Sequence, residues 1–282
     1  MQDFADRVAV ITGAGSGIGR ALAQHAGSLG MRVVAADIEE PALAETVSAI
    51  TATGGRARAV PTDVSKAEAV QHLADLVFDE EGGAHLLCNN AGVFAGGVLW
   101  ERPLHDFEWA LGVNYYGIVH AVRSFVPRML TQADESHIVN TASMGGLVTN
   151  AYCGPYYSSK FAAVGLTECL AHDLASVTDK VHASVLVPSL IATNIGTSER
   201  NRHERFVDRL QPDPSPDAAF IAQALRDSTA GGMAPDEVAA LVFDAVRAKR
   251  FYIPTKPSYH DQIRARHDDM QELRLPRPPA LD

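Results

Sequence analysis

The chain has 282 residues, of which 46% are hydrophobic and 21% are charged, and its formal net charge is −10. This composition is typical of a globular protein with a full core, and the length fits one large α/β domain over residues 1–282 better than two domains. The acidic balance, without a basic run, disfavours a nucleic-acid or anionic-membrane partner. We find no signal peptide and no run of roughly 18 apolar residues, so we expect a cytoplasmic protein.

The cysteines and histidines give little sign of chemistry. Cys88, Cys153 and Cys169 are widely spaced, which argues against a disulfide scaffold and for a reducing compartment. We expect Cys88 and Cys169 to be small buried hydrophobes. No histidine has the spacing of a metal ligand, and His172-Asp173 is expected to be a surface pair, so no metal site is predicted.

Apolar runs alternate with helical patterns along the chain. This alternation predicts a doubly wound α/β fold, in which helices cover both faces of a parallel sheet. Seven strands are expected, at Arg7–Thr12, Arg32–Asp37, Ala57–Thr62, His85–Asn89, His137–Thr141, Val181–Val187 and Phe251–Pro254.

Helical periodicity is clear in several of the connecting segments. Helices are expected at Arg20–Leu29, from Pro41 onward, at Pro103–Met129 with an interruption at Asn114, at Tyr156–Val177, at Ala218–Leu225 and from Pro235 onward. Residues 193–232 are weakly periodic, and we expect a substrate lid there, with Glu199–Arg209 as its solvated outer face. The tail, residues 257–282, is expected to be loosely held.

The stretch from Thr12 to Gly19 joins the first strand to the first helix and contains three glycines. Gly13 permits a backbone conformation that a Cβ would forbid, Gly17 leaves room for a phosphate, and Gly19 lets the helix pack closely on the strand. The free N–H groups at the start of the helix favour a pyrophosphate. Asp37 ends the second strand, where a carboxylate can bind the ribose hydroxyls. Together they predict a dinucleotide site.

Polar residues follow two further strands. Asp63 and Val64 come after the third strand and could border an adenine ring. Asn89 and Asn90 end a buried strand at the rim where such sheets bind ligands. A polar turn is the simpler explanation of the two amides, but we favour a structural hydrogen-bonding role near the cofactor.

Tyr156, Lys160 and Ser143 form the candidate reactive cluster. Tyr156 and Lys160 are four residues apart, so they share one face of a helix, whereas Tyr157 has no such partner. Lowering the tyrosine pKa from ~10 by about three units needs roughly 4 kcal/mol. A lysine ammonium ~5 Å away, at an effective dielectric constant of ~20, supplies about 3 kcal/mol. The pair is therefore predicted to form a phenolate, while Ser143 orients a substrate oxygen.

These motifs, in this order, resemble those of the short-chain dehydrogenase/reductase family, closely over residues 6–193 and more loosely to residue 254. By this resemblance Tyr156 is the general acid/base, Lys160 holds the nicotinamide ribose, and Ser143 positions the substrate oxygen. Asn114 would stabilise a helix kink and a proton-relay water, although a mid-helix asparagine usually faces solvent. The usual Pro-Gly of the family is Pro188-Ser189 here, so the local turn is expected to differ. The resemblance implies cofactor contacts from Gly13, Ser16, Gly17, Ile18, Gly19, Asp37, Asp63, Val64, Asn90, Ala91, Gly92, Tyr156, Lys160, Pro188, Ile191 and Thr193.

We therefore expect a single doubly wound Rossmann domain with the strand order 3-2-1-4-5-6-7. Its expected activity is that of an oxidoreductase that transfers a hydride between NAD and a secondary alcohol or ketone. NAD is favoured over NADP because Asp37 repels a 2′-phosphate, because Ile38 rather than an arginine follows it, and because Ala14 is uncharged. The alternatives are an NADPH-dependent carbonyl reductase and a non-catalytic dinucleotide sensor, with a scaffold protein less favoured. Phe220, Ile221 and Leu225 on the lid and Leu147, Val148 and Tyr152 opposite are expected to line a pocket for a hydrophobic substrate body.

The two long helices, Pro103–Met129 and Tyr156–Val177, are expected to pair between copies of the chain. The second carries more apolar residues than one core stripe needs, namely Phe161, Val164, Leu166 and Leu170. Members of the family it resembles commonly pair these helices, so a homodimer or homotetramer is predicted.

Overall fold

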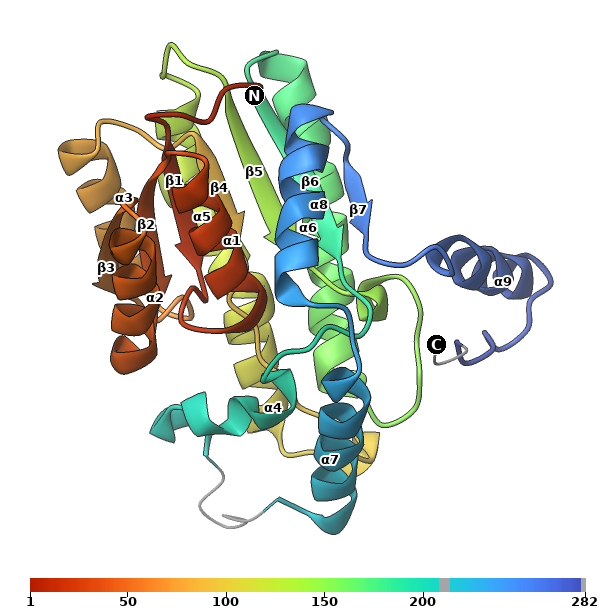
Figure 1. Cartoon of the computed structure of the whole chain (residues 1–282). Helices are drawn as coiled ribbons and strands as arrows, with labels where there is room; N and C mark the ends of the chain where they lie inside the picture. The colour runs from red at the N-terminus through yellow and green to blue at the C-terminus, as the bar shows by residue number, and fades with distance from the viewer. Residues whose placement is uncertain (208–213, 280–282) are drawn as a thin grey trace.

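The computed structural model describes residues 1–207 and 214–279 (Figure 1). Within these residues one sheet has seven parallel strands in the order β3-β2-β1-β4-β5-β6-β7. The strands are β1 Val8–Thr12, β2 Arg32–Asp37, β3 Arg56–Pro61, β4 Leu86–Asn89, β5 Ser136–Thr141, β6 Val181–Val187 and β7 Tyr252–Pro254. The doubly wound fold and the predicted strand order are confirmed, with two strand ranges identical and the others shifted by one residue at one or both ends.

The central strands are buried throughout because both of their faces are covered. Every residue of β1, β4 and β5 is buried. In register, Val10 of β1 lies between Val34 of β2 and Leu87 of β4. This rigid centre brings the carboxyl ends of the strands to one edge of the sheet.

Helices form a layer on each face of the sheet (Figure 1). On one face Leu22 of α1 and Phe243 of α8 belong to one apolar cluster, and on the other face Leu73 of α3 and Phe125 of α5 belong to a second. The helices are α1 Gly17–Ser28, α2 Glu40–Ala52, α3 Ala67–Glu80, α4 Leu104–Leu111, α5 Gly117–Met129, α6 Gly154–Val177, α7 Pro216–Ala230, α8 Pro235–Arg247 and α9 Tyr259–Gln271. Short 3₁₀ turns lie at Leu99–Glu101, Met144–Gly146, Ile195–Asn201 and Glu204–Phe206.

The long helix expected at Pro103–Met129 consists of α4 and α5, joined by a π-helical turn at Gly112–Tyr116. Asn114 lies in this turn with its side chain buried. Unlike most mid-helix asparagines, it therefore does not face solvent. π-helical turns inside α-helices are frequent at functional sites, and here the turn carries Asn114, whose amide is hydrogen-bonded to Val93 and Ser159.

Two further predictions about the chain were wrong. Residues 259–271 form helix α9 rather than a loose tail, and Figure 1 shows this helix beside the end of β7, apart from the two helical layers. Its stripe of partly buried side chains, such as Ile263, was too short to be recognised in a polar segment. Cys169 is exposed because it lies on the outer face of α6, whereas Cys88 is buried as predicted. No helix in residues 1–207 and 214–279 is long and apolar enough to cross a membrane.

Candidate active site

A cleft of about 510 Å³ lies at the carboxyl ends of the strands. Fifteen of the sixteen residues predicted to contact the cofactor line it, as does Ser143: Gly13, Ser16, Gly17, Ile18, Asp37, Asp63, Val64, Asn90, Ala91, Gly92, Tyr156, Lys160, Pro188, Ile191 and Thr193. Gly19 and Asn114 lie behind this lining. The fold thus brings nearly all of the predicted residues into one continuous site.

The glycine-rich loop between β1 and α1 has the geometry of a phosphate cradle. Gly13 has φ of +67°, and a Cβ there would lie 2.8 Å from the Cα of Ala91. Gly17 has φ of +51° and faces Thr193. A Cβ on Gly19 would lie 2.0 Å from the Gly13 carbonyl oxygen, which explains the close packing of α1 on β1. Since α1 begins at Gly17, its free N–H groups open into the cleft, and the loop fits a pyrophosphate.

Asp37 is held in place at the end of β2. Its Oδ2 accepts a hydrogen bond from the Gly15 N–H at 2.7 Å, and its Oδ1 accepts one from the Glu39 N–H at 2.9 Å. These two bonds fix the carboxylate while it still lines the cleft. A carboxylate oxygen has more than one lone pair, so Asp37 can also accept ribose hydroxyls.

The amides after β4 bind the protein itself. Asn90 donates from Nδ2 to the Thr12 carbonyl oxygen at 3.1 Å, and Thr12 Oγ1 accepts the N–H groups of Asn90 and Ala91. Asn89 donates from Nδ2 to Asn140 Oδ1 at 2.8 Å. The bonds of Asn90 tie the loop after β4 to β1, and the bond of Asn89 ties the end of β4 to β5, which is the structural role favoured for the two amides.

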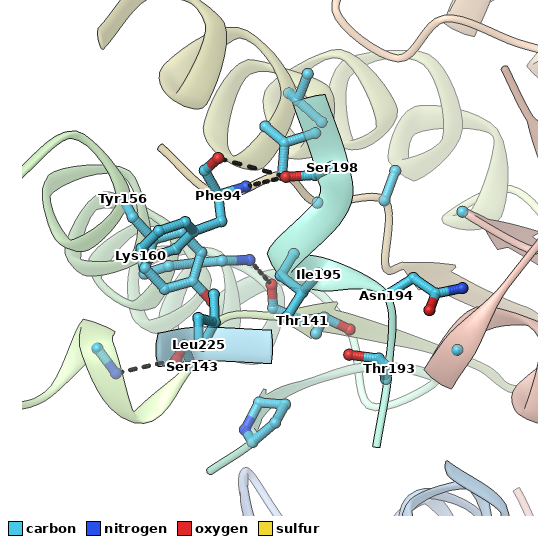
Figure 2. A pocket seen from close by; sticks show the side chains of 18 of the residues that line it. Phe94, Thr141, Ser143, Tyr156, Lys160, Thr193, Asn194, Ile195, Ser198 and Leu225 are labelled. Carbon is cyan, nitrogen blue, oxygen red and sulfur yellow. Dashed lines mark hydrogen bonds between the residues drawn. The ribbon is translucent and has the colours of Figure 1, made fainter. Parts of the chain in front are cut away.

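Ser143, Tyr156 and Lys160 converge on the same wall of the cleft (Figure 2). Ser143 follows β5 and starts a 3₁₀ turn, where its Oγ accepts the Gly145 N–H at 3.0 Å. Tyr156 lies in the first turns of α6 and forms a hydrogen bond with Ser143. Lys160 lies one turn further on, with its Nζ 5.7 Å from the centre of the Tyr156 ring and donating to the Thr141 carbonyl oxygen at 3.0 Å.

The pKa values of Tyr156 and Lys160 differ from those that the expected phenolate requires. Desolvation raises the pKa of Tyr156 to about 12, although the hydrogen bond from Ser143 opposes this rise. Burial also lowers the pKa of Lys160 to about 7. The sequence argument assigned a full positive charge to the lysine and left out the cost of removing both groups from water, which is the larger effect here.

Asn114 is a positioning residue behind the cleft. Its Oδ1 accepts the Val93 N–H at 2.8 Å, and its Nδ2 donates to the Val93 carbonyl oxygen and to Ser159 Oγ. Ser159 in turn donates to the Tyr156 carbonyl oxygen at 2.6 Å. Asn114 thus connects the π-helical turn to α6 and to the loop after β4, and it fixes the helix that carries Tyr156 and Lys160.

The turn after β6 leads from the cleft into the lid. The Ser189 N–H donates to Thr255 Oγ1 at 3.0 Å, and the Pro188 carbonyl oxygen accepts the Met144 N–H at 2.9 Å. The turn at Pro188-Ser189 is therefore held by the residue after β7 on one side and by the Ser143 turn on the other. Ile191, just before the lid, is buried and pairs with Met233, just after the lid.

The charged part of the lid is only partly solvated, contrary to the expectation for Glu199–Arg209. Arg202 is largely buried: its Nη1 lies 2.7 Å from Asp106 Oδ1, and its guanidinium stacks 4.1 Å from the Trp109 ring centre. Phe206 is also buried. The physical reason is that α4 offers a carboxylate and an indole face to this arginine. Residues 208 and 209 lie outside the described residues.

The substrate end of the cleft is apolar, with one correction to its predicted lining. Ile221 and Leu225 of α7 line it, as do Val148 and Tyr152. Phe220 is 71% exposed and faces outward, because the next residue of α7, Ile221, is the one that faces the cleft. Leu147 is partly buried and packs against the apolar cluster beside α6 instead.

Sequence reasoning missed several residues of this site. Phe94 lines the cleft and packs on Tyr156 with 5.2 Å between the ring centres, and its N–H donates to Ser198 Oγ at 2.9 Å. Glu39 and Arg200 also line the cleft. A glutamate two residues after Asp37 was the available signal for this pair, but its arginine partner is 161 positions away.

The family model of the short chain dehydrogenases matches residues 7–204, and the chain therefore belongs to this family. A CLA biosynthesis dehydrogenase/reductase of Lactiplantibacillus plantarum is 34% identical over 94% of this chain and 93% of its own. A 1-deoxy-11-beta-hydroxypentalenate dehydrogenase of Streptomyces exfoliatus is 33% identical over 96% of this chain and 91% of its own. With such relatives, the protein is an oxidoreductase enzyme.

Two solved structures show what related clefts bind. A short chain dehydrogenase/reductase from Burkholderia phymatum in complex with NAD is 44% identical, with a TM-score of 0.96 and 99% of both chains covered. A metagenomic short-chain oxidoreductase in complex with NADP is 27% identical, with a TM-score of 0.67 and coverage of 89% of this chain and 97% of that one. Both cofactors thus occur on this fold.

Proposed function

We propose that the enzyme transfers a hydride between NAD and a secondary alcohol or its ketone. The observation that carries this proposal is the continuity of the cleft, in which the glycine-rich loop and Asp37 share one cavity with Ser143, Tyr156 and Lys160. A sensor would have no use for such a cluster. When bound, the nicotinamide supplies the hydride acceptor or donor.

The residues of the chain then manage the proton and the substrate oxygen. Ser143 and the Tyr156 hydroxyl are hydrogen-bonded to each other and can both contact one oxygen in the cleft. With a pKa of about 12, Tyr156 is protonated at neutral pH and is the proton donor in ketone reduction. For alcohol oxidation it has to lose this proton. Lys160, with a pKa near 7, can take up a positive charge that favours the phenolate.

NAD is proposed over NADP because of the fixed carboxylate of Asp37. A 2′-phosphate would be repelled by this negative charge. The carboxylate cannot easily turn away, because the N–H groups of Gly15 and Glu39 hold it in place. We expect NAD to be preferred by at least roughly 100-fold in kcat/KM, about 2.7 kcal/mol. The NADP complex of a related oxidoreductase keeps the NADPH-dependent reductase as the second candidate.

A substrate with a hydrophobic body fits the apolar wall formed by Ile221, Leu225, Val148 and Tyr152. The experiment compares turnover of apolar secondary alcohols and ketones with turnover of sugars and polyols. Each substrate is tested with NAD(H) and with NADP(H), and the absorbance of the reduced nicotinamide measures the rate. Turnover of apolar substrates with NAD supports the proposal. Cofactor binding without any turnover identifies a sensor, and a preference for sugars contradicts the substrate class.

We also propose a cytoplasmic homodimer or homotetramer, although the basis for the assembly is narrower than expected. Val164 and Leu170 are buried in their own chain, because α6 packs on the sheet and on neighbouring helices with both residues. Phe161 and Leu166 are only partly buried, with Phe161 against the Arg266 guanidinium and Leu166 against an apolar cluster of its own chain. Light scattering at micromolar concentration should give a multiple of 30.2 kDa, and a 30.2 kDa particle would exclude the assembly.

A further inference from the structure

The adenosine side of the cleft is bridged by three polar side chains. Arg200 Nη2 lies 2.8 Å from Glu39 Oε1, and Asn201 Nδ2 donates to the same oxygen at 2.6 Å. Glu39 lies between β2 and α2, whereas Arg200 and Asn201 end the 3₁₀ turn Ile195–Asn201 of the lid. All three residues line the cleft. The bridge therefore joins its two walls.

Both sides of this bridge are anchored. The Glu39 N–H donates to Asp37 Oδ1 at 2.9 Å, so the glutamate is tied to the proposed ribose-binding carboxylate. On the lid, Arg200 Nη1 donates to the carbonyl oxygens of Thr197 at 3.0 Å and Asn194 at 3.3 Å. The Arg200 guanidinium thus cannot move without the turn that carries it.

The lid segment between these anchors passes along the proposed cofactor site. At its start, the Thr193 methyl group would lie 2.9 Å from a Cβ on Gly17, at the phosphate cradle. At its end, Arg200 reaches Glu39 beside Asp37. Ser198, midway, binds the Phe94 backbone (Figure 2). The segment therefore runs from the pyrophosphate end to the ribose end of the site.

The coupling free energy of the Glu39–Arg200 bridge determines how large a change in rate or equilibrium constant a substitution should cause. Exposed ion pairs contribute little to stability, often nothing measurable. Here the Arg200 and Glu39 side chains are only 35% and 30% exposed, and one glutamate oxygen serves two donors. A coupling of about 1 kcal/mol corresponds to roughly a fivefold change in an equilibrium or rate constant.

We propose that Glu39, Arg200 and Asn201 form a latch that closes the lid over the adenosine half of the bound dinucleotide and opens for its entry and release. The proposal rests on the proposed function only in requiring that the cleft binds a dinucleotide. It is independent of the substrate and of the choice between NAD and NADP. Glu39 and Arg200 act as positioning residues, through the lid.

The first experiment measures the latch in the ligand-free protein, by hydrogen exchange. Glu39→Ala should increase amide exchange in residues 195–201, which lie on the opposite wall of the cleft from the substitution. Glu80→Ala is the matched control. It also removes an acidic side chain, but this one pairs with Arg58 at a distance of 2.6 Å and does not line the cleft. Unchanged exchange in residues 195–201 of the Glu39 variant would overturn the latch.

The second experiment measures NADH release by stopped-flow fluorescence. Glu39→Ala and Arg200→Ala should each increase the dissociation rate about three- to tenfold, and the double variant should be no faster than the faster single variant. Arg200→Lys should restore most of the slow release, while Glu80→Ala should match the wild type. Acceleration by Glu39→Ala alone would indicate a direct glutamate–adenosine contact, and additive effects would indicate two independent residues. Either result rejects the latch.

The two proposals fail in different ways. If the wild-type protein binds NADPH rather than NADH, the proposed cofactor choice is wrong, and the release experiment is repeated with NADPH. If it binds neither, the cofactor assignment is wrong, and hydrogen exchange alone decides whether Glu39 holds the lid.

Discussion

At the scale of single residues, the reactive cluster depends on desolvation as much as on spacing. Tyr156 and Lys160 lie one helical turn apart, but burial shifts their pKa values toward the neutral forms, to about 12 and about 7. Their charges are therefore set by what enters the cleft. A cationic ring or a bound oxygen would change the balance within the same geometry.

Replacing Tyr156 by phenylalanine removes the proton donor and keeps the ring that packs on Phe94. We expect turnover to fall by roughly 10²- to 10⁴-fold, while NADH affinity in a fluorescence titration stays close to that of the wild type. Tyr157→Phe is the matched control, since it removes a hydroxyl from the next residue. Near-normal turnover of the Tyr156 variant, or an equal loss in both, would refute the assignment.

Replacing Asp37 by asparagine keeps the shape of the side chain and removes its charge. Because the carboxylate accepts the N–H groups of Gly15 and Glu39, the amide should keep one of these bonds at most. We expect the ratio of kcat/KM for NAD over NADP to fall at least tenfold, about 1.4 kcal/mol. Steady-state kinetics with both cofactors give the ratio, and an unchanged ratio would show that Asp37 does not select the cofactor.

At the scale of elements, the lid is held to α4 by buried charges. Asp106 lies between Arg202, at 2.7 Å, and Arg102, at 3.7 Å, and both arginine side chains are largely buried. Such networks are costly to break, since removing one partner leaves an uncompensated charge in a desolvated place. Figure 1 shows α7, the helix that ends the lid, beyond the carboxyl ends of the strands.

We expect Arg202→Ala to loosen the lid without removing the cofactor site. It removes the ion pair with Asp106 and the stacking on Trp109. Trypsin should cleave the lid faster in the free variant than in the wild type, and substrate KM should rise more than kcat falls. Substrate and cofactor together should protect the wild-type lid.

Arg205→Ala is the control for this variant, because Arg205 is exposed and contacts Ser65 and the Phe206 ring from outside. Equal cleavage rates for the wild type and the Arg202 variant would contradict the role of the buried pair. Equal cleavage of the wild type with and without ligands would contradict lid closure.

At the scale of the whole molecule, the end of the sheet opposite the cleft contains a titratable cluster. His137 is buried in β5, where its Nε2 is 2.7 Å from Ser184 Oγ, and burial lowers its pKa to about 3. His182 and Lys249 lie nearby, and Glu135 pairs with Lys249 and with the Met1 amino group. This cluster connects the chain terminus to β5, β6 and the end of α8.

The free energy of unfolding should therefore decrease as the pH falls below about 6.5. Between the unfolded histidine pKa of ~6.5 and the folded value of about 3, the unfolded chain binds a proton that the folded protein does not. This contribution lowers stability by up to about 1.4 kcal/mol per pH unit in that window.

Urea unfolding between pH 7 and pH 4 tests this contribution. His137→Gln should reduce the slope of stability against pH, whereas His72→Gln, at an exposed position of α3, should leave it unchanged. The pKa of Glu135 is lowered to about 2, so its carboxylate adds a second decrease of stability with falling pH, at lower pH. Both variants should keep this contribution. Parallel slopes for the two variants would show that His137 is not responsible.

The sequence by itself determined the features that depend on neighbours within about one turn or on a regular period. The strand ranges follow from continuous apolar runs. The cradle follows from glycines at 13, 17 and 19, and the shared face of Tyr156 and Lys160 follows from helical spacing. The alternation of strands and helices left only a few topologies, and the family resemblance supplied the strand order among them.

Only the tertiary structure decided what depends on distant partners and on water. The Glu39–Arg200 bridge joins residues 161 positions apart, and Arg202 is buried because Asp106 and Trp109 of α4 lie opposite it. The shifted pKa values of Tyr156 and Lys160 arise from burial that no spacing reveals. Periodicity records the local backbone, whereas contact and desolvation are set when separate elements come together.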